Sequence, residues 1–244
     1  MDQRQAAAPP ARCDISEGAS EGVSEPYETY EDICTFCKEA RGELNGFQAL
    51  GVAIGPRDHI LQESPNFVVV PCIGALTGWY VLIVPRRHVM STGWMDQEER
   101  DELRALSGEV RRRLAARAGS QVVIFEHGSY SFRDRGGACH DHAHIHVVAT
   151  ERPVEEFVDY VSSNVTLKPC DDWIEAAAAM VNRSLRSYLA LASQEGSWIG
   201  HVDRAPSGFF RKSMMRWLGE DPDQHDWLVY PQTERLRSMV VKGI

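Results

Sequence analysis

The chain has 244 residues, of which 43% are hydrophobic, and a formal net charge of −9. This length suffices for one generous domain, or for a domain with an extension, around a real core. No apolar run approaches the roughly 18 residues of a membrane span, and the opening MDQRQAAAPPAR has no hydrophobic signal core. We therefore expect a cytoplasmic protein without a membrane partner, and the negative charge argues against broad nucleic-acid binding.

The sequence contains six cysteines, an even number that could suggest disulfides. A chain of this length without a secretory signal needs no disulfide framework, so thiols or metal ligands are the better interpretation. The cysteines are at positions 13, 34, 37, 72, 139 and 170.

The first part of the chain divides into a tail and the start of a folded region. Residues 1–28 are rich in Ala, Pro, Ser, Gly and acidic residues and lack hydrophobic periodicity, so a disordered tail is predicted there. The pattern becomes globular from residue 29. Two β-type runs at 66–73 and 79–85 flank a turn-like GALTG, which predicts a buried hairpin.

A long helix and two further strands follow the hairpin. The spacing of leucine and valine predicts a helix over 96–118, and Asp96 with Glu99 resembles a capping box at its start. Strands are predicted at 121–127 and 142–150. The loop between them, GSYSFRDRGGACHD, is rich in Gly and Arg and is a candidate phosphate site.

The segment after Pro153 mixes helical and strand patterns and has no linker that would separate it from the first part. Together the elements predict an α+β protein, with an antiparallel sheet and packed helices. In this segment, helices are predicted at 154–163, 171–185, 207–219 and 233–243, and short strands at 187–193 and 197–202.

The most informative stretch is CHDHAHIHVVA at 139–149. Successive side chains of a strand point to opposite faces, so His142, His144 and His146 would share one face. A dense histidine run can also be an incidental metal-binding tract. Three histidines at a period of two in an otherwise apolar strand favour chemistry, because each would need a buried polar partner.

HAHIHVV fits the pattern His, apolar, His, apolar, His, apolar, apolar, and on these residues the chain resembles the histidine-triad (HIT) superfamily of nucleotide hydrolases and transferases. The resemblance covers roughly residues 31–150. It includes CTFC, the hairpin ending in VPRRH, the long helix and the strand before the triad loop. It implies a HIT-like fold, with a catalytic domain at 29–152 and a C-terminal extension at 153–244 packed on it.

The resemblance also implies catalytic roles. His144 would attack the α-phosphorus of a nucleotide and form a covalent nucleotidyl-histidine, while His146 would donate a hydrogen bond to phosphate. Backbone N–H groups from Gly137 to His140 could hold the developing charge. Gly137, Cys139 and His140 are therefore candidate substrate contacts, with the Cys139 thiol as a contact or packing group.

Cys34 and Cys37 form a CxxC, which by itself could be redox-active, metal-binding or coincidental. Relatives that carry this CxxC complete a zinc site with the histidine after the hairpin and the first histidine of the triad. These positions are His88 and His142 here, so the resemblance implies a structural Zn²⁺ held by two cysteines and two histidines. A metal-free, reduced CxxC is the alternative.

The sequence departs from the family pattern at two strands. Tyr80 stands where many members have a histidine, and Glu126 or His127 would replace an asparagine that contacts substrate. Arg133 and Arg135, in the loop before the triad, could meet phosphate or could simply be solvated. Because of these departures, the sequence does not identify the leaving group of the substrate.

The leading hypothesis is a hydrolase that cleaves a nucleoside phosphate derivative at the α-phosphorus and releases a nucleoside monophosphate. One alternative is a nucleotidyltransferase that uses the same intermediate. Another is a zinc-stabilised module that binds nucleotides or RNA without turnover. The expected partner is a nucleotide or nucleotide conjugate, with a homodimer as one option for the oligomeric state.

Overall fold

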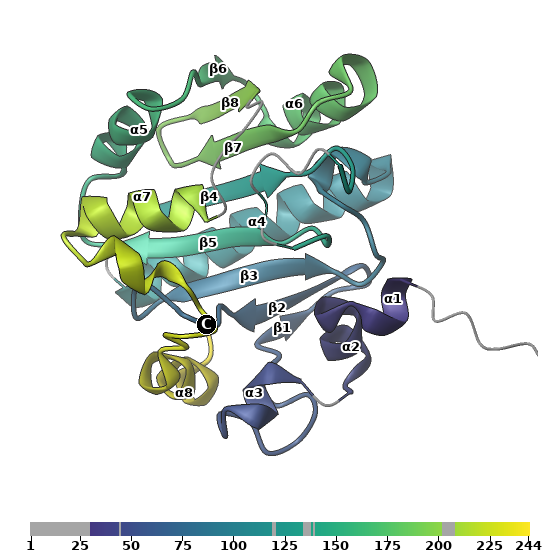
Figure 1. Cartoon of the computed structure of the whole chain (residues 1–244), viewed down its shortest axis with the longest axis vertical. Coiled ribbons are helices and arrows are strands. Elements are labelled where there is room, and N and C mark those ends of the chain that lie inside the picture. The colour runs from purple at the N-terminus through teal and green to yellow at the C-terminus, as the bar shows by residue number, and fades with distance from the viewer. Residues whose placement is uncertain (1–29, 44, 119–120, 134–137, 139, 202–207) are drawn as a thin grey trace, which may run out of the picture.

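Figure 1 shows the computed structural model, which describes residues 30–43, 45–118, 121–133, 138, 140–201 and 208–244. The strands are β1 (Gln62–Glu63), β2 (Phe67–Pro71), β3 (Tyr80–Pro85), β4 (Gln121–Gly128), β5 (Ile145–Thr150), β6 (Lys168–Cys170), β7 (Tyr188–Ala192) and β8 (Ser197–His201). In the described part of the chain they form one eight-stranded sheet in the order β1-β2-β3-β5-β4-β7-β8-β6. Every neighbouring pair is antiparallel, which confirms the predicted fold class.

The helices lie around this sheet, with α4 behind it and α7 in front of it in the view of Figure 1. They are α1 (Tyr30–Ile33), α2 (Thr35–Arg41), α3 (Gly46–Ala49), α4 (Gln97–Ala118), α5 (Val154–Ser162), α6 (Trp173–Ala179), α7 (Phe209–Leu218) and α8 (Thr233–Lys242). Short 3-10 helices occupy Thr92–Trp94 and Pro222–His225, and a π-helical turn occupies Met180–Ser184. Among the described helices, none combines the length and the apolar character that crossing a membrane requires.

The long helix α4 begins with the capping box that the sequence predicts. The Glu99 backbone N–H donates to Oδ1 of Asp96 at 2.9 Å, and the Asp96 N–H donates back to Oε2 of Glu99 at 3.0 Å. Two otherwise unsatisfied N–H groups are thereby paired at the helix start. Leu103, Leu106 and Val110 then bury the helix against one face of the sheet.

Among the predicted strands, the largest shift of a start is that of the strand with the histidines. β5 begins at Ile145 rather than at residue 142, so His142 and His144 lie in the segment just before the strand. The neighbouring strand β3 ends at Pro85, which has no N–H to extend the ladder, and the Ala143 N–H donates instead to the Val89 carbonyl at 2.7 Å. The backbone therefore leaves the ladder at this point.

The chain after residue 153 continues the same sheet. β7 pairs with β4, and β8 and β6 follow, so the outermost strands are β1 with two residues and β6 with three. α7 covers the opposite sheet face from α4, where Phe210 contacts Phe125 at a ring distance of 4.8 Å. The domain division at residue 152 stays a prediction.

The junction of β4 and β7 depends on a glycine. Gly128 lies opposite the fully buried Tyr188, whose hydroxyl donates to Oε2 of Glu126 at 2.7 Å and accepts the Gly93 N–H at 3.1 Å. A β-carbon on Gly128 would lie 2.0 Å from Cζ of Tyr188. The ring therefore occupies the space that any other residue would need.

We predict that Gly128→Ala lowers the free energy of unfolding by about 3 kcal/mol, because overpacking must displace Tyr188 from its hydrogen bonds. Urea unfolding followed by circular dichroism measures this change. Gly78→Ala is the matched control, since a β-carbon on Gly78 meets no atom within 4 Å. Equal stabilities of the two variants would contradict the account of this junction.

Candidate active site

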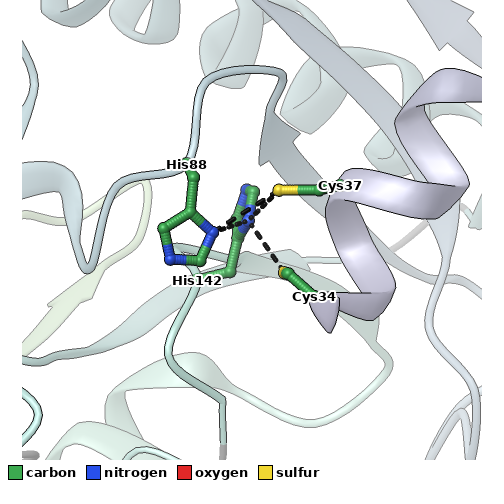
Figure 2. Close-up of side chains that lie close together, drawn as sticks. All are labelled: Cys34, Cys37, His88 and His142. Carbon is green, nitrogen blue, oxygen red and sulfur yellow. Dashed lines mark hydrogen bonds between the residues drawn. The ribbon is translucent and has the colours of Figure 1, made fainter. Parts of the chain in front are cut away.

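Two cysteines and two histidines from three separate segments meet beside the triad (Figure 2). Cys34 is the N-cap residue of α2 and Cys37 lies in its first turn, His88 follows β3, and His142 precedes β5. Their donor atoms all lie within 4.8 Å of one another. The structure thus brings together the four residues that the resemblance implies as metal ligands.

The distances in this cluster suit a small ion with tetrahedral geometry. Sγ of Cys34 and of Cys37 each lie 3.4 Å from Nδ1 of His142, and the two Nδ1 atoms of His88 and His142 are 3.1 Å apart. A tetrahedral ion with sulfur ligands at about 2.3 Å and nitrogen ligands at about 2.05 Å would give edges of about 3.6 and 3.3 Å. The cluster could therefore bind a metal ion.

Burial sets the protonation states of two residues of the cluster. Burial and the neighbouring Cys34 raise the pKa of the Cys37 thiol to about 12, and burial lowers the pKa of His142 to about 3. A bound metal ion would lower the pKa of the Cys37 thiol again, because coordination deprotonates a thiol. The lowered pKa of His142 suits metal binding, because a neutral imidazole is the form that binds a metal.

His142 connects this cluster to the second histidine of the triad. Its Nε2 lies 2.9 Å from the Pro85 carbonyl, which places the ring proton on Nε2 and leaves Nδ1 toward the cysteines. Its backbone carbonyl lies 2.8 Å from Nδ1 of His144. A carbonyl can only accept, so Nδ1 of His144 carries the proton and Nε2 carries the lone pair.

The rings of His144 and His146 lie side by side with centroids 4.9 Å apart. Phe36 of α2 stacks on His144 at 5.4 Å, and Phe125 of β4 stacks on His146 at 4.5 Å. The Tyr80 hydroxyl lies 2.7 Å from Nδ1 of His146. Tyr80, at the position where the family pattern often has histidine, thus orients the third histidine of the triad.

Burial keeps these histidines neutral. It lowers the pKa of His144, against the opposing effects of the His142 carbonyl and the charge of Glu126. Burial and the charge of His144 lower the pKa of His146 well below its usual range. The guanidinium of Arg211 adds to both shifts. A neutral imidazole with its lone pair on Nε2 is the nucleophilic form of histidine.

His144 and His146 line a pocket with an empty volume of about 660 Å³, part of which is open to solvent. Arg211 also lines the pocket, and its guanidinium lies 5.8 Å from the ring of Tyr80, whose hydroxyl contacts His146. Glu39 also lines the pocket, but only burial and the Gly46 N–H shift the pKa of its carboxyl, and burial raises it to about 7. The pocket therefore combines a cationic group near His146 with a buried carboxyl group.

The segment after residue 153 completes this pocket. Arg211 of α7 donates to the Gly74 carbonyl at 2.7 Å and to the His225 carbonyl at 3.0 Å, and it is 5% exposed. Arg235 of α8 donates to the carbonyls of Ala75 and Leu76 at 2.9 and 2.8 Å. These bonds hold α7 and α8 to the turn between β2 and β3.

The other candidate contacts have varied positions. His140 lines the pocket and lies edge-on to His144 at 5.5 Å. Glu126 is fully buried, and its oxygens accept from the Thr92 N–H and the Tyr188 hydroxyl. His127 stacks on Phe210 at 4.9 Å, and its buried Nε2 has no hydrogen-bond partner within the described residues.

The remaining candidate contacts belong to the loop before the triad. Arg133 is exposed, while Arg135, Gly137 and Cys139 lie outside the described residues.

The structure adds pocket residues that the sequence reasoning missed, namely Phe36, Glu39, Arg211 and Trp227. Only Arg211 carries a clear sequence signal. With Met214, Met215 and Leu218 it follows helical spacing, so a charged residue stands on the apolar stripe of α7. An arginine in such a place requires polar partners inside the fold.

No family model and no curated protein matches the chain. Solved structures do match. A hypothetical histidine triad nucleotide-binding protein from Sulfolobus tokodaii has 19% identity and a TM-score of 0.38, covering 49% of this chain and 70% of that one. A histidine triad protein from Clostridium difficile has 21% identity and a TM-score of 0.35, with 49% and 92% covered.

A further match is yeast Ap4A phosphorylase in complex with AMP, at 10% identity and a TM-score of 0.37, with 70% of this chain and 74% of that chain covered. Histidine triad proteins are thus among the matching structures.

Proposed function

We propose that the chain is a histidine-triad enzyme that hydrolyses a nucleoside phosphate derivative at the α-phosphorus and releases a nucleoside monophosphate. The observation that carries the proposal is the orientation of His144. Its Nδ1–H is held by the His142 carbonyl at 2.8 Å, and its ring lines the pocket beside His146 and Arg211. A fixed, neutral imidazole in a pocket with a cationic group suits attack on phosphorus.

In the first step, Nε2 of His144 attacks the α-phosphorus. The new N–P bond replaces the bond to the leaving group, which departs with its electron pair. Developing negative charge on the phosphate oxygens would be met by His146 and Arg211, which line the same pocket. Arg133, Arg135 and the backbone of Gly137 to His140 stay proposed phosphate contacts.

In the second step, water attacks phosphorus on the nucleotidyl-histidine and the N–P bond breaks. Nε2 of His144 recovers its lone pair, the nucleoside monophosphate leaves, and the water proton passes to solvent. A nucleotidyltransferase would share the first step and use another acceptor in place of water. A binding module without turnover would need none of this orientation of His144.

We further propose that the metal of the Cys34, Cys37, His88 and His142 cluster is zinc. Two thiolates and two imidazoles at tetrahedral spacing are a zinc ligand set, and four protein ligands leave no open position for catalysis. When bound, the ion supplies structural cross-linking. His142 would then present its carbonyl to His144 from a fixed place.

The nucleophile can be tested by mass spectrometry. Incubated with nucleoside polyphosphates or nucleotide conjugates and quenched in alkaline denaturant, the wild-type protein should gain the mass of one nucleotidyl group. His144→Ala should show no adduct and lose turnover by at least about 1,000-fold, while His201→Ala, which alters a histidine of β8, should keep both. Turnover that survives in His144→Ala would sink the mechanism.

The role of Arg211 can be tested against a matched arginine. Arg211→Gln should reduce kcat/KM about 10- to 100-fold, since a charge-assisted hydrogen bond is worth about 1.5–3 kcal/mol. Arg211→Lys keeps the charge and should restore part of the lost kcat/KM. Arg235→Gln also breaks carbonyl bonds to the same turn, but Arg235 does not line the pocket. Steady-state kinetics in which both Gln variants lose equal activity would show that Arg211 is only structural.

The metal proposal predicts about one equivalent of zinc in protein purified without added metal, measured by elemental analysis. Cys34→Ser and His88→Ala should lose it and unfold at lower temperature, because metal binding contributes folding free energy. Cys170→Ser should retain it, as Cys170 lies in β6, outside the cluster. A stable wild-type protein without metal would refute this part.

A further inference from the structure

Tyr30, the first residue of α1, contacts each of the three segments that meet at the cluster of two cysteines and two histidines. Its backbone carbonyl accepts a hydrogen bond from the Cys34 N–H at 3.1 Å. Its ring lies edge-on to the ring of His88, with centroids 4.9 Å apart. Its hydroxyl donates to Oδ2 of Asp141, the residue before His142, at 2.5 Å. One residue therefore joins the start of α2, the segment after β3 and the segment before β5.

These contacts lie where the cluster is least buried. Two members of the cluster, Cys34 and His88, are half-buried, and the other two are buried. Tyr30 contacts both of the half-buried members, and it is itself 39% exposed. Tyr30 thus borders the cluster on the side that is nearest to solvent.

Apolar burial does not explain why α1 lies in this place. The helix has four residues, and none of them is buried. A helix of one turn is not stable by itself, so its position depends on the contacts that it makes with the rest of the chain. The hydroxyl bond to Asp141 and the ring contact with His88 are two such contacts, and both lead to the cluster.

A ligand set that comes from three segments holds a metal ion only while these segments stay together. Contacts outside the ligand set fix the orientation of the ligands, and their loss typically weakens metal binding about 10- to 100-fold. Tyr30 makes contacts of this kind with two ligands directly, and with the third segment through Asp141. Its hydroxyl therefore opposes the separation of the segments that would have to part before an ion could leave.

We propose that Tyr30 is a positioning residue that slows the loss of the metal ion, through the hydrogen bond of its hydroxyl to Asp141. The assignment rests on the proposed zinc site and needs no nucleotide turnover. The carboxylate of Asp141 accepts and the phenol donates, so removal of either group breaks the bond. The retention of zinc would then depend on a residue that does not touch the ion.

The experiment measures how fast zinc leaves the full-length protein. Zinc-loaded protein is mixed with an excess of pyridylazoresorcinol, a chelator whose absorbance reports the released metal. Tyr30→Phe keeps the ring and loses the hydroxyl, and it should release zinc about 10-fold faster than the wild type. Tyr230→Phe is the matched control, because Tyr230 is 40% exposed and lies outside the cluster. It should release zinc at the wild-type rate.

A double-mutant cycle separates the hydrogen bond from a general loss of stability. Asp141→Ala removes the acceptor and should also release zinc faster, and the addition of Tyr30→Phe should then have no further effect. Asp141→Asn keeps an accepting oxygen and should restore part of the slow release. Independent, additive effects of the two substitutions, or a wild-type rate of release in Tyr30→Phe, would overturn the proposal.

Elemental analysis of the same preparations separates this proposal from the proposed zinc site. If the wild-type protein takes up no zinc, both proposals fail. If it binds about one equivalent and Tyr30→Phe releases zinc no faster, the zinc site stands and the assignment of Tyr30 fails. The outcome for catalysis is separate, because the nucleotidyl adduct of His144 plays no part in either measurement.

Discussion

The hydrogen bond between Nδ1 of His144 and the His142 carbonyl, at 2.8 Å, is the contact on which the site depends. It decides which ring nitrogen of His144 carries the lone pair. The carbonyl belongs to a residue whose own ring is fixed between the Pro85 carbonyl and the two cysteines. The cluster of two cysteines and two histidines is therefore linked to the ring of His144, which it does not contact, through one residue and its backbone.

The cationic group of the pocket depends in turn on the segment after residue 153. Arg211 reaches the pocket from α7, and its position is set by the carbonyls of Gly74 and His225. Gly74 itself has φ +74°, and a β-carbon there would lie 2.8 Å from Cβ of Trp227. The close approach of this segment to the turn thus requires a glycine, and it brings Arg211 and Trp227 into the pocket.

Much of the fold could be predicted from local patterns. The capping box of Asp96 and Glu99, the hairpin and the antiparallel class all follow from spacing and turn residues. The start of β5 could not, because it is set by Pro85 and Val89 of a segment more than 50 residues away. Local periodicity does not record where a partner strand ends.

The residues of the site can also be divided into those that the sequence could predict and those that it could not. The grouping of Cys34, Cys37, His88 and His142 was accessible through the resemblance, since motif spacing carried it. Glu39 was not, because a glutamate within TFCKEARGE usually faces solvent. The helical spacing around Arg211 indicates that it is buried, but not which pocket it enters. Their place in the pocket arises only when α2 and α7 approach it from distant parts of the sequence.

The pairing of β7 with β4 has a consequence for self-association. β4 is hydrogen-bonded on both sides, so the backbone edges left among the described strands are β1 and β6, of two and three residues, and β6 contains Pro169. Short edge strands and an edge proline are among the means by which proteins prevent sheets from joining edge to edge and aggregating. A second copy of the chain would therefore find little backbone at the outermost described strands on which to continue the sheet.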